Sequence, residues 1–515
     1  MSSSFDFVIV GGGTAGLALA VRLAEDAAAT VCVLEAGEDY AQNEDVKIPG
    51  NYMTNIGKPF DGGLLSTPQA HSANRVIYNP RGKGLGGSSI LNWLQVIRRV
   101  AFSPQSFETT LGAKGWNSGE FLKYFKKSQS LPQGQTQIKS NYVLKPDPAL
   151  FGDGPIACAA LGVSFNPVGG NGNNSGVWPA LSAIDPKTVT RVSSASAYLE
   201  PNRAKSNLKV ISQARATRIL FKHSASTTAI ATGVVYTLNS GEKEFTVQAN
   251  KEVILCAGTF RTPQVLEMSG IGNKEHIQKG VTQIIDLPGV GNNLQKISKI
   301  KQMVAAADTT NTSIKSPSSI KVLQNWMSDE NAYQLEFIMV PHHVPFLPNG
   351  EFNAAKKYCF FSIIVDHPFS RGSAHIDPAS PAGNPIVDLG IFENEIDLEI
   401  LAEGIKFIQK LIAQPSMRDD AGVRPIAPSP AIKSDEDIKE YIKQAAFTAY
   451  HPIGTASMLP REEFGVVDHN LVVYGTSNLR IADASIIPVH ISAHPMATVY
   501  AIAEKAADII KAAWK

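Results

Sequence analysis

Residues 5–35 read FDFVIVGGGTAGLALAVRLAEDAAATVCVLE, and this stretch decides the fold. A short apolar run at 5–10 leads directly into three glycines, and a helical stretch follows over 17–25. A second apolar run, 30–34, then ends on Glu35. Strand, glycine turn, helix, strand and carboxylate in this order and spacing are typical of a βαβ unit that binds a dinucleotide.

Each glycine of this turn has a predicted task. Gly11 permits the tight turn, Gly13 lets the backbone approach a pyrophosphate, and Gly16 lets helix and strand pack closely. The helix N-terminus presents unpaired N–H groups and a partial positive charge to that pyrophosphate. Glu35 follows Gly16 by 19 residues, so its carboxylate can accept hydrogen bonds from a ribose diol. A glycine-rich turn without a ligand is the competing interpretation, and the flanking strands and the carboxylate argue against it.

The length and composition are typical of a globular enzyme. A chain of 515 residues is too long for one simple core, so we expect two joined domains. Lys plus Arg exceed Asp plus Glu by only 47 − 46 = 1, and no basic run stands out, so nucleic acid is not an expected partner. No apolar stretch reaches membrane-spanning length, and we therefore expect no membrane span.

The N-terminus and the cysteines bear on the compartment. The first strand is entered by Phe5, which leaves no room for a secretory signal. The four cysteines lie far apart in mostly apolar surroundings, as is typical of buried free thiols in a reducing compartment. We therefore expect an intracellular, cytoplasmic protein.

A second glycine-rich stretch, residues 79–92, reads NPRGKGLGGSSILN. Glycines at this density indicate that the backbone itself contacts something, because side chains have been removed from the contact. An ordinary surface turn is the alternative interpretation of this stretch.

Apolar spacing and capping residues predict the elements around these turns. A β-rich passage spans 207–258 and ends in an apolar strand that meets glycine, and residues 358–365 read as a buried strand. We expect helices that start at Asn117 and at Thr262-Pro263, a helix over 396–412 capped by Asn394, a helix from Ser434 through Phe447, and a helix over 498–514.

Together these segments resemble the glucose–methanol–choline (GMC) family of FAD-dependent oxidoreductases over nearly the whole chain. The local sequence around the motifs is most similar to that of fungal members. Lys296-Ile297 and Arg98-Arg99 depart from the family pattern on the substrate side. Besides the two glycine-rich stretches, the resemblance rests on Gly258…Thr262-Pro263…Ser269-Gly270-Ile271-Gly272, Asp286-Leu287-Pro288-Gly289-Val290-Gly291…Asn293-Leu294-Gln295, His451-Pro452…Gly454-Thr455, Asp483-Ala484-Ser485 and Ala503-Glu504-Lys505.

The resemblance implies a mixed α/β fold with two domains. A Rossmann-like FAD-binding domain is expected to be discontinuous, over 1–155, 207–300 and 440–515. A substrate-binding domain, built on an antiparallel sheet flanked by helices, is expected over 156–206 and 301–439.

The resemblance also implies which residues hold FAD. In such enzymes the N-terminal turn and Glu35 bind the ADP half, and the second glycine-rich stretch lies along the flavin. Some members attach the flavin to a histidine just before the position of Asn92; here that residue is Leu91, so we expect non-covalent FAD. The implied cofactor-binding residues are Gly11, Gly13, Thr14, Ala15, Gly16, Glu35, Arg81, Gly86, Gly87, Ser88, Asn92, Ala214, Asp483, Ala484, Pro495 and Met496.

Two of the eleven histidines fall where the family places residues over the flavin. His451 precedes Pro452, and Ala503-Glu504-Lys505 fixes the register of His494, whereas His490 falls four residues early. The resemblance implies alcohol oxidation by hydride transfer to flavin N5, with His451 as the principal base and His494 as a partner that orients the hydroxyl. The sequence leaves open which of the two takes the proton, and His490 is expected to contribute little to the chemistry.

The expected function is therefore the FAD-dependent oxidation of a small primary alcohol, aromatic alcohols included, to the aldehyde. Oxygen or a quinone-like compound is the expected electron acceptor. A non-redox flavoprotein of the same family, a lyase or a cyclase, is the alternative. No metal site is expected, because His342-His343 are adjacent in sequence and no Cys/His cluster is present. The exact substrate, the choice of acceptor and the oligomeric state stay open.

Overall fold

The computed structural model describes residues 3–97, 106–131, 135–136, 155–166, 176–178, 182–223, 228–239, 241–295, 314–328, 335–341, 359–420 and 422–515. Three sequence features named above lie outside the described residues: Arg98-Arg99, Lys296-Ile297 and His342-His343.

One sheet carries the N-terminal glycine turn. Its central strand β1 (Ser3–Val10) pairs in parallel with β2 (Val31–Leu34) on one side and with β12 (Glu244–Leu255) on the other. The strand β11 (Ala229–Leu238) runs antiparallel to its neighbours, and the pairings around β1, β2 and β19 (Leu479–Ile481) are parallel. Within the described residues the sheet has seven strands, in the order β10 (Ala214–His223), β11 (Ala229–Leu238), β12, β1, β2 and β9 (Leu208–Ile211), with β19 (Leu479–Ile481) paired to β12.

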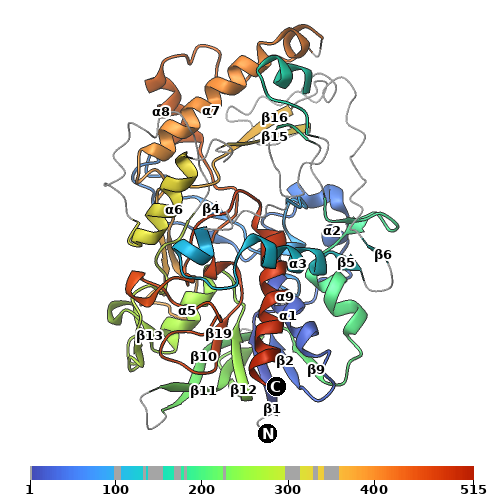
Figure 1. Cartoon of the computed structure of the whole chain (residues 1–515), viewed down its shortest axis with the longest axis vertical. Coiled ribbons are helices and arrows are strands. Elements are labelled where there is room, and N and C mark those ends of the chain that lie inside the picture. The colour runs from blue at the N-terminus through green and yellow to red at the C-terminus, as the bar shows by residue number, and fades with distance from the viewer. Residues whose placement is uncertain are drawn as a thin grey trace.

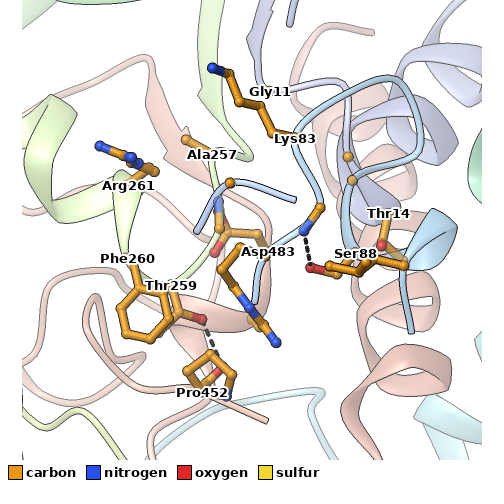
Figure 2. Close-up of a pocket in the computed structure, with 18 of the residues that line it drawn as sticks. Gly11, Thr14, Lys83, Ser88, Ala257, Thr259, Phe260, Arg261, Pro452 and Asp483 are labelled. Atoms are coloured by element: carbon orange, nitrogen blue, oxygen red, sulfur yellow. Dashed lines mark hydrogen bonds between the residues drawn. The ribbon is translucent and has the colours of Figure 1, made fainter. Parts of the chain in front are cut away.

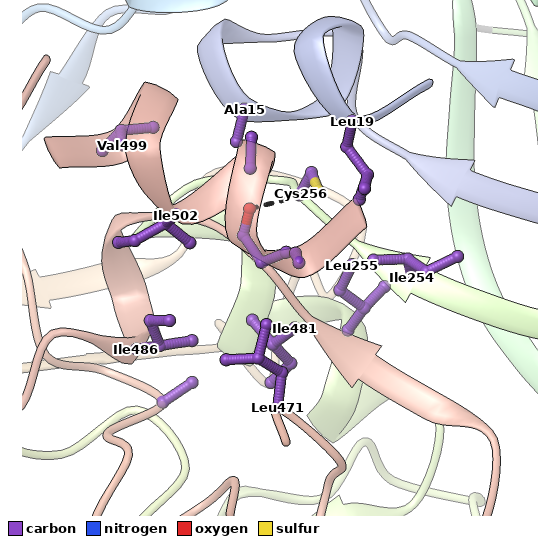
Figure 3. Close-up of a cluster of buried hydrophobic side chains, with 14 of the residues drawn as sticks. Ala15, Leu19, Ile254, Leu255, Cys256, Leu471, Ile481, Ile486, Val499 and Ile502 are labelled. Carbon is purple, nitrogen blue, oxygen red and sulfur yellow. Dashed lines mark hydrogen bonds between the residues drawn. The ribbon is translucent and has the colours of Figure 1, made fainter. Parts of the chain in front are cut away.

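Two helices cover the parallel part of this sheet. The helix α1 (Thr14–Leu23) starts directly after the glycine turn, and α9 (Pro495–Ala513) packs beside it near the C-terminus of the chain (Figure 1). Figure 3 shows Leu19 of α1, Ile502 of α9 and Leu255 of β12 in one buried cluster. The N-terminal β1 and α1 and the C-terminal α9 therefore share one hydrophobic core. Burial of apolar surface in such a core is the dominant favourable term in folding.

The predicted elements are found with small differences at their ends. The passage 207–258 forms four strands of the large sheet, because its last two apolar runs join into the single strand β12. Helix α3 (Ser118–Ser128) starts where expected, since the Asn117 side chain accepts a hydrogen bond from the Glu120 N–H at 2.9 Å. Helix α5 (Arg261–Met268) contains the expected Thr262-Pro263.

A second group of elements lies at the opposite end of the molecule from β1 (Figure 1). The strands β15 (Glu336–Pro341) and β16 (Cys359–Ile364) pair antiparallel, next to helices α7 (Ile396–Ile412) and α8 (Asp435–Ala445). The Ser434 hydroxyl caps α8 by accepting from the Asp437 N–H, and this helix ends two residues before the expected Phe447. Besides short 3-10 and π turns, further helices and strands are α2 (Glu44–Lys47), α6 (Pro317–Ser328), β3 (Leu64–Leu65), β4 (Tyr78–Asn79), β5 (Ser130–Leu131), β6 (Gln135–Thr136), β7 (Ile184–Asp185), β8 (Thr190–Arg191), β13 (Ile271–Gly272), β14 (Ile285–Asp286), β17 (Ser373–His375) and β18 (Ile386–Asp388).

The mixed α/β architecture expected from the sequence is confirmed. The division into FAD-binding and substrate-binding ranges stays a prediction, although the strands of the large sheet all come from the ranges assigned to the FAD-binding domain. In the part of the chain that the structure describes, no helix is long and apolar enough to cross a membrane. The same part holds no group of three or more His, Cys, Asp or Glu side chains arranged to bind a metal.

Candidate functional site

The N-terminal turn accepts only glycine at two of its positions. Gly11 has φ +106°, and a Cβ atom there would lie 2.3 Å from the carbonyl oxygen of Cys256. A Cβ atom on Gly16 would lie 1.8 Å from the carbonyl oxygen of Gly11. Both atoms would overlap backbone, so strand β1, helix α1 and the end of β12 can approach this closely only because side chains are missing.

The two glycine-rich stretches meet backbone to backbone. A Cβ atom on Gly87, which has φ +50°, would lie 2.7 Å from the Cα atom of Gly13. The Gly86 N–H donates to the Gly12 carbonyl at 2.8 Å, and the Ser194 hydroxyl donates to the Gly13 carbonyl at 3.1 Å. The second stretch therefore forms a wall directly beside the N-terminus of α1, and the surface-turn alternative does not apply to it.

Glu35 is held at the end of β2 by backbone donors. Its two carboxylate oxygens accept from the N–H groups of Gly12 and Gly37, each at 2.8 Å. The side chain is buried, and burial raises the pKa of this carboxyl above its usual value despite those hydrogen bonds. The Gly84 backbone also contributes a hydrogen bond, and because a carboxylate has about four lone-pair sites, room is left for a ribose hydroxyl.

One cavity of about 710 Å³ connects these groups with the histidine pair. Figure 2 shows Gly11, Thr14, Ser88 and Asp483 converging on it from different segments. Gly16 and Gly86 do not line the cavity, and both act in the backbone contacts that shape its wall. The sequence-predicted residues that line it are Gly11, Gly13, Thr14, Ala15, Glu35, Arg81, Gly87, Ser88, Asn92, Ala214, His451, Asp483, Ala484, His494, Pro495 and Met496.

Asp483 organises the wall opposite the second glycine stretch. Its Oδ2 atom accepts from the Gly258 N–H at 2.9 Å and from the Thr262 hydroxyl at 2.7 Å. Its Oδ1 atom accepts from the Ser485 N–H at 2.8 Å, which caps a short turn of helix. The end of β12, the start of α5 and the segment after β19 are thereby joined at one carboxylate.

Asn92 and Arg81 each connect the second glycine stretch to the C-terminal part of the chain. The Asn92 amide lies 2.9 Å from the sulfur of Met496, in the first turn of α9. The partly buried Arg81 guanidinium donates to the carbonyls of Pro80 and Tyr450. Burial lowers the pKa of Arg81 to about 10, so it stays charged at neutral pH.

His451 and His494 face each other at one end of the cavity. Their ring centroids lie 4.5 Å apart. The Nδ1 atom of His451 is buried and has no hydrogen-bond partner among the described residues. Burial, with the neighbouring His494 adding to it, lowers the pKa of His451 well below its usual value. His451 is therefore a neutral imidazole at neutral pH, in a state that can accept a proton.

Sequence reasoning missed the carboxylate beside the second histidine. The Oε1 atom of Glu336, on β15, lies 3.2 Å from Nε2 of His494. Burial alone would lower the pKa of His494, but the Glu336 carboxylate, with Asp366 adding to it, raises the pKa above its usual value. The two rings are thus pushed in opposite directions, the pattern that separates an acid from a base in an active site.

His490 lies behind this pair rather than in the cavity. It is fully buried, and its Nε2 atom lies 3.0 Å from the carbonyl oxygen of His451. Its Nδ1 atom lies 3.0 Å from the carbonyl oxygen of Ile491, and its backbone N–H donates to Gln295. Burial lowers the pKa of His490 to about 4, so the ring is neutral and carries one N–H.

Apolar and aromatic side chains line the cavity near the histidines. Trp93 makes an edge-to-face contact with Tyr52, at 5.7 Å between ring centroids, and another with Phe360 of β16. The β15–β16 register pairs Glu336 with Ile364 and Ile338 with Ser362, and Ile338, Ser362 and Ile364 line the cavity. Since side chains two apart share one face of a strand, Glu336 lies on this face too. The signal available in the sequence was the alternation of side chains along a strand, which puts residues 336 and 338 on one face and residues 362 and 364 on one face. This part of the chain carries few motifs that would have drawn attention to it.

Comparison with known proteins identifies the class. The sequence profile of the GMC oxidoreductase family matches residues 5–297 and residues 368–503. The chain belongs to the GMC oxidoreductase family. The resemblance seen in the sequence is confirmed, and the protein is an FAD-dependent oxidoreductase of this family.

Individual relatives cover the chain almost completely. The GMC oxidoreductase family protein Mala s 12 of Malassezia sympodialis is 34% identical over 572 residues, which span 98% of this chain and 92% of that protein. A fungal aryl-alcohol oxidase of known structure is 25% identical, with a TM-score of 0.80 and 100% of both chains covered. Pyridoxine 4-oxidase from Mesorbium loti is 25% identical, with a TM-score of 0.80 and 98% of both chains covered.

The residues around the cavity fit the family cofactor. The contact of Gly13 with Gly87 leaves the α1 N-terminus free of side chains, as a pyrophosphate needs, and Glu35 lies at the same end. At the other end, the buried Nδ1 atom of His451 has no hydrogen-bond partner within the described part of the chain. Which residue contacts which part of FAD stays a prediction.

Proposed function

We propose that this GMC oxidoreductase oxidises a small primary alcohol to the aldehyde, with His451 as the base and His494 as its charged partner. The observation that carries the proposal is the pair of neighbouring imidazoles with opposite pKa shifts on the wall of one cavity. The names of two structural relatives, an aryl-alcohol oxidase and a pyridoxine 4-oxidase, agree with a CH–OH donor.

The cavity-lining residues are assigned to FAD as the sequence suggested. Gly13 at the α1 N-terminus receives the pyrophosphate, Glu35 the ribose, and the Gly86–Asn92 backbone the ring system, with no covalent bond. Bound FAD supplies the acceptor for the hydride that leaves the alcohol carbon, and oxygen or a quinone-like compound then takes the electrons.

The two histidines divide the handling of the hydroxyl. Neutral His451 accepts the hydroxyl proton as the hydride leaves the carbon. The Glu336 carboxylate raises the pKa of His494, and in its protonated form His494 donates a hydrogen bond to the same oxygen and stabilises the negative charge that develops there. This division favours His451 over His494 as the group that takes the proton.

The proposed substrate is uncharged and carries an apolar or aromatic group. Trp93, Ile338 and Ile364 supply apolar surface next to the histidines, and Ser362 is a small polar group among them. The half-exposed ring of Phe447 lies at the edge of the same cavity. A benzylic or heteroaromatic primary alcohol fits such a lining, because aromatic rings gain from edge and face contacts of this kind.

Anaerobic mixing with candidate alcohols tests the reaction. We expect benzylic and pyridyl primary alcohols to bleach the flavin absorption of the purified holoenzyme, and the colour to return with air or a quinone. His451→Ala should retain FAD and reduce its flavin about a hundredfold more slowly, the usual scale for a lost general base. Cyanohydrin cleavage without bleaching would instead support the lyase alternative, and a wild-type rate in His451→Ala would refute the assignment of the base.

A further inference from the structure

The backbone that carries His451 is held at three consecutive carbonyl groups. Each carbonyl accepts a hydrogen bond from a side chain in a different part of the chain, and Figure 2 shows the one between Thr259 and Pro452. We call these three side chains the carbonyl clamp: Arg81 Nη2 donates to Tyr450 O, His490 Nε2 lies 3.0 Å from His451 O, and Thr259 Oγ1 donates to Pro452 O at 2.8 Å.

This segment needs support from side chains. Residues 446–449 and 451–452 lie between α8 and the next bridge without regular secondary structure. Tyr450 has φ +62°, a left-handed conformation that costs a residue other than glycine about 1 kcal/mol. Buried carbonyls without a helix or sheet partner require other donors, and the clamp supplies them.

The hydroxyl of Thr259 is itself fixed in place. Thr259 follows Gly258, whose N–H is bound by Asp483, and the Thr259 carbonyl accepts from the hydroxyl of Thr455. The segment after His451 and the loop before α5 are therefore joined in both directions. A shift of one of them would move the other.

The proton of the His490 ring is assigned by the other bonds around it. A neutral imidazole has one N–H, but both ring nitrogens of His490 face carbonyl oxygens. The Ile491 carbonyl already accepts from the Ala493 N–H at 2.8 Å. Among the described residues, the donor offered to the His451 carbonyl is His490, and so the proton belongs on Nε2.

We propose that His490 and Thr259, together with Arg81, are positioning residues that hold the His451 imidazole at the cavity wall. The inference rests on the proposed function, since it assumes that His451 is the base. It gives His490 a part in the reaction that its place outside the family register did not suggest. A base must lie within hydrogen-bond reach of the proton that it takes, and small displacements from that geometry lower the rate.

Pairs of substitutions in the holoenzyme distinguish the loss of a hydrogen-bond donor from a change in side-chain packing. Thr259→Val keeps the shape without the hydroxyl, and Thr259→Ser restores the donor. His490→Leu removes the ring donor, and His490→Gln restores an N–H. Thr237→Val is the matched control, because the buried Thr237 hydroxyl has no hydrogen-bond partner among the described residues.

Two measurements are made on each variant. We expect Thr259→Val and His490→Leu to lower the limiting rate of anaerobic flavin reduction about fivefold, with unchanged substrate Kd, because each loses one hydrogen bond. Thr259→Ser and His490→Gln should stay within twofold of wild type, as should Thr237→Val. Hydrogen–deuterium exchange should increase in peptides covering 448–455 of the two impaired variants only.

The outcomes are distinct from those that test the base itself. Wild-type reduction rates in Thr259→Val and His490→Leu would overturn the clamp, and so would equal losses in the two donor-restoring variants. If His490→Leu does not retain FAD, the isosteric Thr259→Val decides. If His451→Ala reduces its flavin slowly and the clamp variants are unaffected, the proposed function stands and the clamp is refuted. If His451→Ala reduces its flavin at the wild-type rate, the proposed function itself is refuted.

Discussion

His451 and His494 carry opposite pKa shifts although their rings are neighbours. Burial dominates at His451, and the positive charge of His494 adds to the lowering. At His494 the Glu336 carboxylate outweighs burial and raises the pKa. Under the proposed function, the form that reacts has neutral His451 and charged His494, and this form is populated between the two pKa values.

We therefore predict a bell-shaped pH dependence for flavin reduction. Activity should fall on the acid side only well below pH 6.5, where His451 takes a proton, because its pKa is lowered. It should fall on the alkaline side above pH 6.5, where His494 loses its proton, because its pKa is raised. Glu336→Gln removes the cause of the raised pKa and should move the alkaline limb to lower pH, as measured by stopped-flow reduction.

A second buried Glu–His pair provides the control for this prediction. His375 Nδ1, on β17, lies 2.6 Å from Glu267 Oε1, on α5. Neither residue lines the cavity. Glu267→Gln should leave the alkaline limb of the surviving activity unchanged. An alkaline limb that stays in place in Glu336→Gln would show that another group controls it.

The residues of the site were predictable where the chain carries a local motif. His451 and His494 each lie in one, and the structure brings their rings together. Glu336 has no motif, and its partner His494 lies on an element far away in the chain. Their contact depends on how β15 lies relative to the start of α9, which follows from packing of the whole chain and not from spacing.

Among the elements, the two glycine turns act as one unit. Gly13 and Gly87 lie in backbone contact, and the Gly86 N–H donates to the Gly12 carbonyl. Neither turn could keep this position if the other were displaced. The sequence predicted each turn separately, and the close approach between them is a tertiary feature that no spacing along the chain specifies.

Gly87→Ala should therefore separate the turns and weaken FAD binding. The new Cβ atom would lie 2.7 Å from the Gly13 Cα atom, and φ +50° adds about 1 kcal/mol of backbone strain. We expect at least a tenfold higher Kd for FAD, measured by quenching of flavin fluorescence on reconstitution. Gly50→Ala is the control, because a Cβ atom there meets nothing within 4 Å. Equal Kd values for FAD in the two variants would contradict this prediction.

Element ends were predicted less well than element positions. Helix α9 starts at Pro495, three residues before the expected Thr498, because the first turn of a helix tolerates proline and the chain already turns at His494. Helix α8 stops at Ala445, where Ala446 takes an extended conformation that leads into the His451 segment. In both cases the helix end lies next to the segment that carries one of the two site histidines, and the conformation of that segment sets where the helix starts or stops.

For the molecule as a whole, His490 links the site to acid stability. Burial places its folded pKa at about 4, below the usual value of 6.5, so the folded state binds fewer protons than the unfolded state. Its contribution is complete above pH 6.5 and is lost as the pH falls towards 4. The full change amounts to about 3 kcal/mol.

His490→Gln removes this titration and should flatten the acid dependence of stability. Urea unfolding of the holoenzyme at pH 7 and near pH 4 gives the free energy of unfolding for both proteins. The difference between the two pH values should be smaller in the variant by up to about 3 kcal/mol. Parallel curves for the two proteins would show that His490 is not the group that titrates.

The way the cofactor is held is also a property of the whole chain. Leu91 occupies the position where some family members carry the histidine that bonds to flavin, and it packs against Val46 and Phe60 while lining the cavity. Under the proposed assignment, non-covalent binding depends on contacts from both glycine turns, Glu35 and the first turn of α9, and unfolding would remove all of these contacts together. Acid precipitation should therefore release the yellow chromophore into the supernatant. A precipitate that stays yellow, with a flavin-sized increase in the mass of the intact chain, would contradict non-covalent binding.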